Sequence, residues 1–285
     1  MVAVRIVTDS TADLSEEHVK DCGLTVIPLN VHFGDETYKD GVDLTPEQFM
    51  VKLKSTPAIP RTSQPSAGEF LEIYRRLAAD GDEVVSIHIS GRLSGTIASA
   101  DAARGMAEGS VTVVDSLSAS QGLAMCAMVA GRAAQAGRSK DDILALVQRL
   151  IPETYIIFSV DTLEYLQKNG RIGRAQALLG SLLNVKPILI LDKDGVVAPY
   201  DKVRGKSRVI PRLVSAVKER IPAGTKVRIA AIHAQAEDAA QALLEETGKH
   251  YQVQEKWVAP IGPVIGCHTG PGAIGVIIQR VADGE

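Results

Sequence analysis

Residues 86–100 read SIHISGRLSGTIASA, a segment in which an apolar run enters a Ser/Gly/Thr-rich turn and leaves it as a helical pattern. A strand followed by a turn and a helix is the repeating unit of a parallel-sheet α/β fold. The turn predicts an anion site, because free backbone N–H groups near Ser94, Gly95 and Thr96 would face a ligand at the positive end of the helix dipole. Simple capping of the helix by Ser94 or Thr96 is the alternative interpretation.

Strand and helix patterns also alternate on both sides of this segment. The β-rich runs are 2–8, 26–33, 84–89 and 111–114, and the helical patterns between them include 67–79 and 97–106. This alternation predicts a mostly parallel sheet. The stretch STPAIPRTSQPS at 55–66 carries three prolines and no periodicity. We expect it to be an exposed or site-forming loop, with Ser66 capping the helix that follows.

The pattern changes after residue 155. IIFSV, VKPILIL, the turn Lys193-Asp194-Gly195 and VVAPYDKV predict a strand followed by a β-hairpin. Further on, helical patterns at 209–220 and 237–247 alternate with strand patterns at 227–232, 252–258 and 274–278. We therefore predict an N-terminal, mostly parallel-sheet α/β domain over 1–155 and a second domain, an α+β two-layer sandwich, over 156–285.

Composition excludes several classes of function. The net charge is −3 and 4% of the residues are aromatic, so neither a phosphate-neutralising surface nor base-stacking platforms are expected, and we predict no nucleic-acid partner. The three cysteines form no C-x-x-C pair and the six histidines no i, i+4 pair, which argues against a disulfide framework and a metal site. Without a secretory signal pattern or an apolar run of about 18 residues, we expect a cytoplasmic chain with no stable membrane insertion.

Two motifs near the C-terminus invite functional interpretations that their context disfavours. GPGAIG at 270–275 satisfies G-x-G-x-x-G, but no helix and second strand follow it, so we predict a backbone bend instead of a nucleotide site. Cys267 precedes His268, yet neighbours on an extended chain point to opposite faces. A buried, inert thiol is therefore the preferred interpretation of Cys267.

Two further hydroxyl-rich loops resemble the one at Ser94 in composition. TDSTADLS at 8–15 follows the first predicted strand, and RTSQPS spans 61–66. Because the loops after parallel strands gather at the carboxyl edge of a sheet, we expect Asp9 and Ser10 to lie beside Ser94. Asp115 and Ser116, after the fourth predicted strand, would share that edge. For each residue taken singly, a cap or an Asx turn is the preferred interpretation, and it is their coincidence on one edge that favours a site.

Six motifs in fixed order carry a resemblance that covers essentially the whole chain. They are TDSTADLS, TSQPS, LSGTIASA, VDS, LEYLQKNGRIG and CHTGPGAIG. In this respect the sequence resembles the DegV family of fatty-acid-binding proteins, and in particular the FakB-type subunit of bacterial fatty acid kinases.

The resemblance implies a long-chain fatty acid with its tail in an apolar tunnel between the domains and its carboxylate at the mouth. Thr62, Ser94, Gly95 and His268 would contact or orient that carboxylate. It further implies that a separate ATP-dependent kinase phosphorylates the carboxylate and that the acyl phosphate feeds phospholipid synthesis. The chain itself would need no cofactor and perform no catalysis alone.

Basic residues are candidates for contact with the kinase or the incoming phosphoryl group. Arg171 lies in the loop NGRIG, and Arg204 belongs to the basic run at 202–208. A solvated surface is the alternative interpretation of that run.

A serine hydrolase is the competing functional hypothesis. Ser94, His268 and an acid such as Asp9 or Asp115 supply the required residue types. However, residues 91–95 spell G-x-x-S-G, not the G-x-S-x-G of a nucleophile elbow, so Ser94 would not occupy the strained apex. Acyl chain length and oligomeric state stay open at this level.

Overall fold

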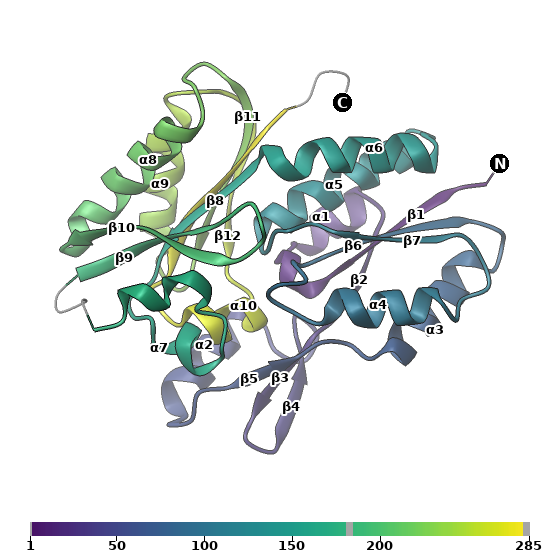
Figure 1. Ribbon diagram of the computed structural model, residues 1–285, viewed down its shortest axis with the longest axis horizontal. Coiled ribbons are helices and arrows are strands. Elements are labelled where there is room, and N and C mark those ends of the chain that lie inside the picture. The colour runs from purple at the N-terminus through teal and green to yellow at the C-terminus, as the bar shows by residue number, and fades with distance from the viewer. Residues whose placement is uncertain (1, 181–184, 282–285) are drawn as a thin grey trace.

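The computed structural model describes residues 2–180 and 185–281. Within this part, two large sheets lie side by side with helices on their outer faces, and a small third sheet projects beneath them (Figure 1). The predicted fold class, a parallel-sheet α/β unit joined to an α+β unit, is confirmed. None of the described helices is both long enough and apolar enough to cross a bilayer.

The N-terminal sheet has the order β2-β1-β6-β7 and is parallel throughout. Its strands are β1 (Val4–Asp9), β2 (Leu24–Ile27), β6 (Glu83–His88) and β7 (Val111–Asp115). On one face lie α3 (Ala67–Ala78) and α4 (Thr96–Arg104), and on the other α5 (Gln121–Gln135) and α6 (Lys140–Leu150). The short α1 (Glu16–Asp21) connects β1 to β2. Both faces are covered, which is why the strands are apolar without strict alternation.

The expectation of one strand over 26–33 is wrong. β2 ends at Ile27, and β3 (Asn30–Phe33) belongs to the small antiparallel sheet of order β4-β3-β5. Pro28 separates the two strands, because it has no N–H for a ladder hydrogen bond. The other members of this sheet are β4 (Glu36–Lys39) and β5 (Arg61–Ser63), with α2 (Pro46–Ser55) between them.

The proline-rich stretch 55–66 is therefore not entirely a loop, since β5 pairs with β3 and sets Thr62 opposite Val31. The prediction that this stretch ends in a helix cap is confirmed. Ser66 caps α3 through a capping box with Glu69.

The second sheet has the order β10-β9-β8-β13-β11-β12. Its strands are β8 (Thr154–Ser159), β9 (Val185–Leu191), β10 (Val197–Arg204), β11 (Lys226–His233), β12 (Gln252–Pro260) and β13 (Ile274–Arg280). The predicted hairpin is confirmed, because β9 and β10 pair antiparallel around Gly195. The predicted domain boundary at residue 155 falls inside β8.

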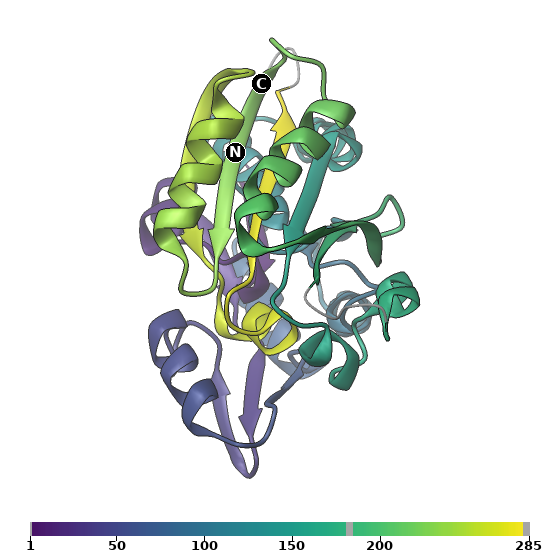
Figure 2. The same ribbon diagram turned by 90° about the vertical axis from the view of Figure 1, so that its left-hand side faces the viewer.

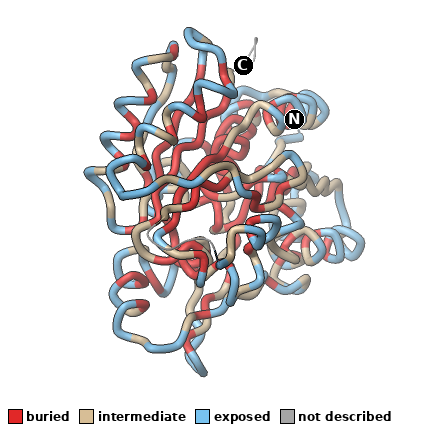
Figure 3. Tube along the Cα trace, turned by 60° about the vertical axis from the view of Figure 1, so that its left-hand side comes forward, coloured by how far each residue is buried: buried red, intermediate tan, exposed pale blue. Residues whose placement is uncertain are grey.

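Helices cover one face of this sheet and leave the other to the N-terminal unit. The covering helices are α8 (Val209–Arg220) and α9 (Glu237–Gly248), which stand together on the outer side of the strands in Figure 2. The short helices α7 (Glu164–Lys168) and α10 (Pro263–Thr269) close its lower end. Buried residues run along both large sheets (Figure 3).

Helix α5 joins the two units. The guanidinium of Arg132 donates to both carboxylate oxygens of Glu255 on β12 at 2.7 Å, and the Trp257 indole N–H donates to the side-chain oxygen of Gln121 at 2.8 Å. Such bidentate and ring N–H bonds fix orientation as well as distance. Both ends of α5 are thereby tied to β12.

We expect Gly131→Ala to destabilise the protein by roughly 1–3 kcal/mol, because a Cβ there would lie 2.2 Å from the carbonyl oxygen of Cys22. The gain in helix propensity, about 1 kcal/mol, opposes this loss. Gly68→Ala in α3 is the matched control, since its Cβ would meet only the Ser66 hydroxyl, at 3.8 Å. Urea unfolding should show a lower midpoint for the first variant and an equal or higher one for the second; equal midpoints would contradict close packing at Gly131.

Candidate functional site

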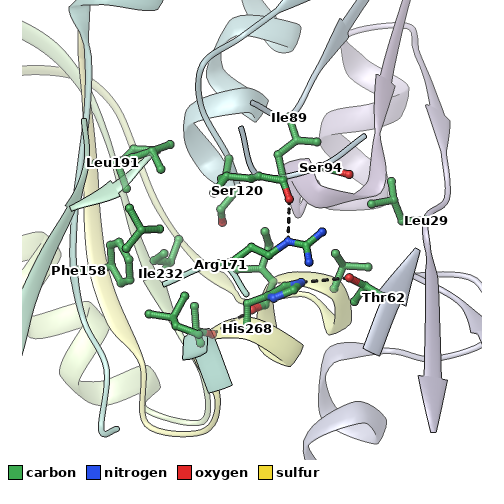
Figure 4. A pocket seen from close by; sticks show the side chains of 18 of the residues that line it. Leu29, Thr62, Ile89, Ser94, Ser120, Phe158, Arg171, Leu191, Ile232 and His268 are labelled. Atoms are coloured by element: carbon green, nitrogen blue, oxygen red, sulfur yellow. Dashed lines mark hydrogen bonds between the residues drawn. The ribbon is translucent and has the colours of Figure 1, made fainter. Parts of the chain in front are cut away.

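A pocket lies where the two large sheets face each other (Figure 4). Its empty space is about 830 Å³ with the open side included. Most of the wall is apolar and comes from both units: Leu29, Ile89, Leu93 and Ala119 from the first, and Ile156, Phe158, Leu166, Leu191, Val197, Ile232, Val264 and Ile265 from the second. The space suits an apolar ligand of many atoms.

Thr62 and His268 meet at one end of this pocket. The Thr62 hydroxyl on β5 and Nε2 of His268 on α10 are 3.0 Å apart, as the dashed line in Figure 4 marks. The two residues are 206 positions apart in the chain. The structure thus brings together two residues that the resemblance had placed at a ligand's head group.

Cys267 and His268 lie on a helix, so the expectation of an extended chain at this point is wrong. Pro263 occupies the first turn of α10 and favours helix initiation. The Cys267 thiol is buried, and burial raises its pKa well above the ordinary value, which agrees with an inert thiol. The predicted backbone bend after it is confirmed by positive φ angles at Gly270 and Gly272.

The other ring nitrogen of His268, Nδ1, is buried and has no hydrogen-bond partner in the described part of the chain. Burial, and secondly the charge of Arg171, lower the pKa of His268 to about 4. The ring is therefore neutral at pH 7. Because buried polar atoms are almost always satisfied in folded proteins, this nitrogen indicates a position where a polar ligand atom belongs.

Arg171 is the only charged side chain among the described residues that line the pocket. Its Nε donates to the carbonyl oxygen of Leu93 at 2.9 Å and its Nη1 to that of Asn169 at 2.8 Å. The Asn169 amide in turn donates to the carbonyl oxygen of Cys267 at 2.8 Å. The guanidinium is thus held between the Ser94 loop and α10, and it gives this end of the pocket a positive potential.

Ser94 lines the same pocket at the start of α4. Its hydroxyl lies 2.8 Å from that of Thr96 and accepts from the Thr96 N–H at 3.4 Å, while the N-cap residue, Gly95, has no side chain that could cap the helix. Capping by Ser94 therefore accounts for one amide of this turn, and the amide groups at the start of α4 keep the orientation that favours an anion.

Gln64 was missed by sequence reasoning. It lines the pocket, and a Cβ on Gly95 would lie 2.5 Å from its Nε2, so the amide side chain lies directly over Gly95. Its place in the motif TSQPS was the available signal.

Asp9, Asp115 and Ser116 support the Ser94 loop without lining the pocket. The Asp9 carboxylate accepts from the backbone N–H of Ile89 at 3.0 Å and pairs with His88 Nδ1 at 2.9 Å. Asp115 accepts from the N–H of Gly91 at 3.1 Å, and the Ser116 N–H donates to the carbonyl oxygen of His88 at 3.0 Å. These bonds tie the loops after β1, β6 and β7 to one another.

Ser10 belongs to a second group that holds α10. Its hydroxyl donates to Asp40 at 2.7 Å, and burial raises the pKa of Asp40 to about 7. The carboxyl of Asp13 accepts from the Ser120 hydroxyl at 2.5 Å and from the N–H of Gly262 at 3.1 Å; burial raises its pKa as well. Asp13 lies in the motif TDSTADLS, which was the available signal for it, whereas Asp40 carries no distinctive sequence signal.

Arg204 is not brought to the pocket. It lies exposed at the end of β10, and Lys202, Lys206 and Arg208 are exposed too.

A serine–histidine–acid triad is not assembled in the described chain. Ser94 pairs with Thr96, and His268 pairs with Thr62. No carboxylate among the described residues contacts His268, so nothing orients the ring as a general base. The same residues contain no group of three potential metal ligands.

A largely apolar pocket with a guanidinium, a neutral imidazole and hydroxyls at one end defines a two-unit α/β protein with a site suited to an amphipathic ligand. A family model described as an uncharacterised protein of the DegV family matches residues 3–281. A DegV domain-containing protein of Deinococcus radiodurans is 39% identical over 283 residues, covering 99% of this chain and 100% of that protein. The chain therefore belongs to the DegV family, as its motifs predict.

Solved structures agree with this assignment. A DegV family protein from Thermus thermophilus, described by its fatty acid binding, has a TM-score of 0.93 and 37% identity, covering 98% of this chain and 100% of that one. A stearic-acid-binding protein from Eubacterium ventriosum has a TM-score of 0.88 and 27% identity, with 98% of each chain covered.

We expect Asp40→Asn to remove a pH dependence of stability. The folded-state pKa of about 7 lies above the ordinary value of 3.8, so the favourable contribution of the protonated carboxyl is complete below pH 3.8 and is lost as the pH rises through 7. As the pH rises between these limits, the free energy of unfolding of the wild type should fall relative to that of the variant by up to about 1.4 kcal/mol per pH unit. Urea unfolding from pH 4.5 to 8 measures this, with the exposed Asp35→Asn as control. Parallel curves for wild type and Asp40→Asn would contradict the buried carboxyl.

Proposed function

We propose that this chain binds one long-chain fatty acid in the pocket and presents its carboxylate to an ATP-dependent kinase. The observation that carries the proposal is the buried, unpaired Nδ1 of His268 beside Arg171, the one charged group among the described lining residues of an otherwise apolar pocket. An amphipathic anion satisfies both features at once.

The apolar wall accounts for the tail. Each methylene moved from water to this wall contributes about 0.8 kcal/mol, and side chains from both sheets surround the space. A long unbranched chain gains the most from such a pocket. The relatives described as binding fatty acid and stearic acid support this choice of ligand.

The polar end accounts for the head group. A carboxylate that leaves water must recover its hydration through several donors. The Thr62 and Ser94 hydroxyls, the Arg171 guanidinium and the His268 ring lie at the pocket, and Gly95 belongs to the turn whose amides favour an anion. In our proposal these groups hold the carboxylate at the mouth.

A separate kinase is proposed because the pocket would hold the carboxylate of the fatty acid, while the chain carries no motif of its own for binding ATP. Its sequence has no phosphate-binding lysine loop in the proper context. In the proposed reaction a carboxylate oxygen attacks the γ-phosphorus of ATP, ADP leaves, and an acyl phosphate forms for phospholipid synthesis. Arg171 would face the transferring phosphoryl group, and Arg204 would contact the partner.

The remaining expectations complete the proposal. Catalysis by the chain alone is not expected, since Ser94 and His268 make no contact as a nucleophile and base. No cofactor is expected besides the bound lipid. The three cysteines are buried and form no disulfide within the described residues, which suits a reducing cytoplasm.

Protein purified from a bacterial host should yield about one fatty acid per chain on extraction and mass spectrometry. Ser94→Ala and Thr62→Val should each weaken binding by about one to two decades, because each removes one charge-assisted hydrogen bond of roughly 1.5–3 kcal/mol while the tail remains anchored. Titration with a fluorescent fatty acid measures the affinities. Ser99→Ala, in the same helix but outside the pocket, is the control. The proposed site would be disproved if no lipid were recovered, or if the variant that combines Ser94→Ala with Thr62→Val bound fatty acid with wild-type affinity.

Arg171→Ala should slow acyl phosphate formation with the cognate kinase more than it lowers lipid occupancy. The guanidinium stabilises the charge that develops on the phosphoryl group, whereas the tail supplies most of the affinity. Arg171→Lys should restore only part of the rate, since an ammonium cannot keep both backbone hydrogen bonds. Single-turnover kinetics with matched lipid loading make the comparison, with Arg104→Ala as a distant exposed control. An unchanged rate in Arg171→Ala would leave this residue a purely structural role.

A further inference from the structure

A second hollow adjoins the pocket on the side opposite its polar end. This outer groove is open to solvent and holds about 1390 Å³ of empty space with its open side included. Ile156 and Leu191 line both hollows. In Figure 4 Leu191 lies across the pocket from Thr62, which belongs to the polar end. The pocket and the groove therefore meet at these two side chains.

One wall runs continuously from the pocket into the groove. Phe158, Ile156 and Thr154 alternate along β8 and so point to the same face of the sheet. Phe158 lines the pocket, Thr154 lines the groove, and Ile156 lines both. β9 ends at Leu191, directly opposite Ile156, so Thr154 and Tyr155 have no β9 residue beside them. The groove begins where that neighbouring strand stops.

The opposite wall also runs from the pocket into the groove. In the loop after β7, Ser120 and Ala119 line the pocket, whereas Ser118 and Leu117 line the groove. A Cβ on Gly122, at the start of α5, would lie 2.8 Å from Cδ1 of Ile156. The loop and the start of α5 thus press directly against the side chain that separates the two hollows.

The loop itself is held rigidly. Leu117 and Ser120 have φ angles of 49°, which are strained for residues other than glycine and persist only where surroundings enforce them. The Leu117 N–H donates to Asp115 at 2.8 Å, the Ser118 carbonyl accepts from the Ser90 N–H at 2.8 Å, and the Ser120 hydroxyl donates to Asp13. Because the loop is held in place, the barrier between the pocket and the outer groove depends on the side chains of Ile156 and Leu191.

We propose that Ile156 and Leu191 form the floor of the acyl pocket and set the longest chain that the protein accepts. This inference rests on the proposed fatty acid binding. A chain that reaches the floor cannot add a methylene without displacing one of these side chains. Removing them would join the pocket to the outer groove, where Leu117 and Tyr155 offer further apolar contact and solvent takes up any excess length.

The test is the affinity for a series of saturated fatty acids from C12 to C24, measured on delipidated wild type, Leu191→Ala and the double variant Ile156→Ala/Leu191→Ala. In the wild type, affinity should rise about fourfold per methylene up to a limiting length and then stop rising or fall. In the variants the rise should continue beyond that length. Leu191 lies at a strand end and is partly exposed, so the single variant should fold even if the double variant does not.

Two controls separate the floor from a general loss of packing. Ile232→Ala widens the pocket away from the groove, so it should lower affinity without moving the limiting length. Leu191→Trp should shorten that length. A limiting length in Leu191→Ala equal to that of the wild type would overturn the floor while leaving fatty acid binding intact. Failure of the wild type to bind any member of the series would instead overturn the proposed function, and the floor with it.

Discussion

The hydrogen bond from the Gly262 backbone N–H to the Asp13 carboxyl, 3.1 Å long, is the contact on which the site depends. It joins the loop after β1 to the start of α10, and Asp40 supports the same segment from the small sheet through Ser10. A Cβ on Gly262 would lie 2.4 Å from the Asp13 carboxylate, so only glycine allows this approach. Two buried carboxyls therefore fix the helix that carries His268. Their raised pKa values follow from the same burial that makes the contact rigid.

The electrostatics of the pocket follow from this arrangement. α10 is fixed close to the β5 strand and to Arg171, so His268 is desolvated and stays neutral while Arg171 alone carries charge among the described lining residues. An isolated cation beside an unsatisfied imidazole in an apolar space favours an anionic head group on an apolar tail. Within the described part of the chain the ring contacts Thr62 and no acid, so a serine–histidine–acid triad is not assembled there. The relatives described by their binding of fatty acid and of stearic acid support the same proposed class of ligand as this geometry.

The two ends of the pocket are held by different kinds of interaction. Its polar end is built from hydrogen bonds that involve backbone groups, such as those from Arg171 to Leu93 and Asn169, which tolerate little displacement. Its far end is closed by side chains of β8 and β9 against a strained loop. In the proposed complex, directional hydrogen bonds would determine the position of the head group, whereas side-chain volume would determine how the tail is accommodated. A protein that presents one fixed atom group to a partner needs the first property, and selection among chain lengths needs only the second.

Sequence alone determined what depends on local patterns: the parallel sheet from β1, β6 and β7, the cap at Ser66, the hairpin around Gly195, and through six motifs the family. It also indicated Thr62, Ser94, His268 and Arg171, which line one pocket. The tertiary structure decided the features that the hydrophobic periodicity of single segments does not determine. Pro28 separates β2 from β3, His268 lies on a helix, and Asp13 and Asp40 hold that helix. The physical reason is that periodicity records which face of an element is buried, whereas the contacts of a site join segments up to 249 residues apart, and only packing of the whole chain determines which polar groups meet.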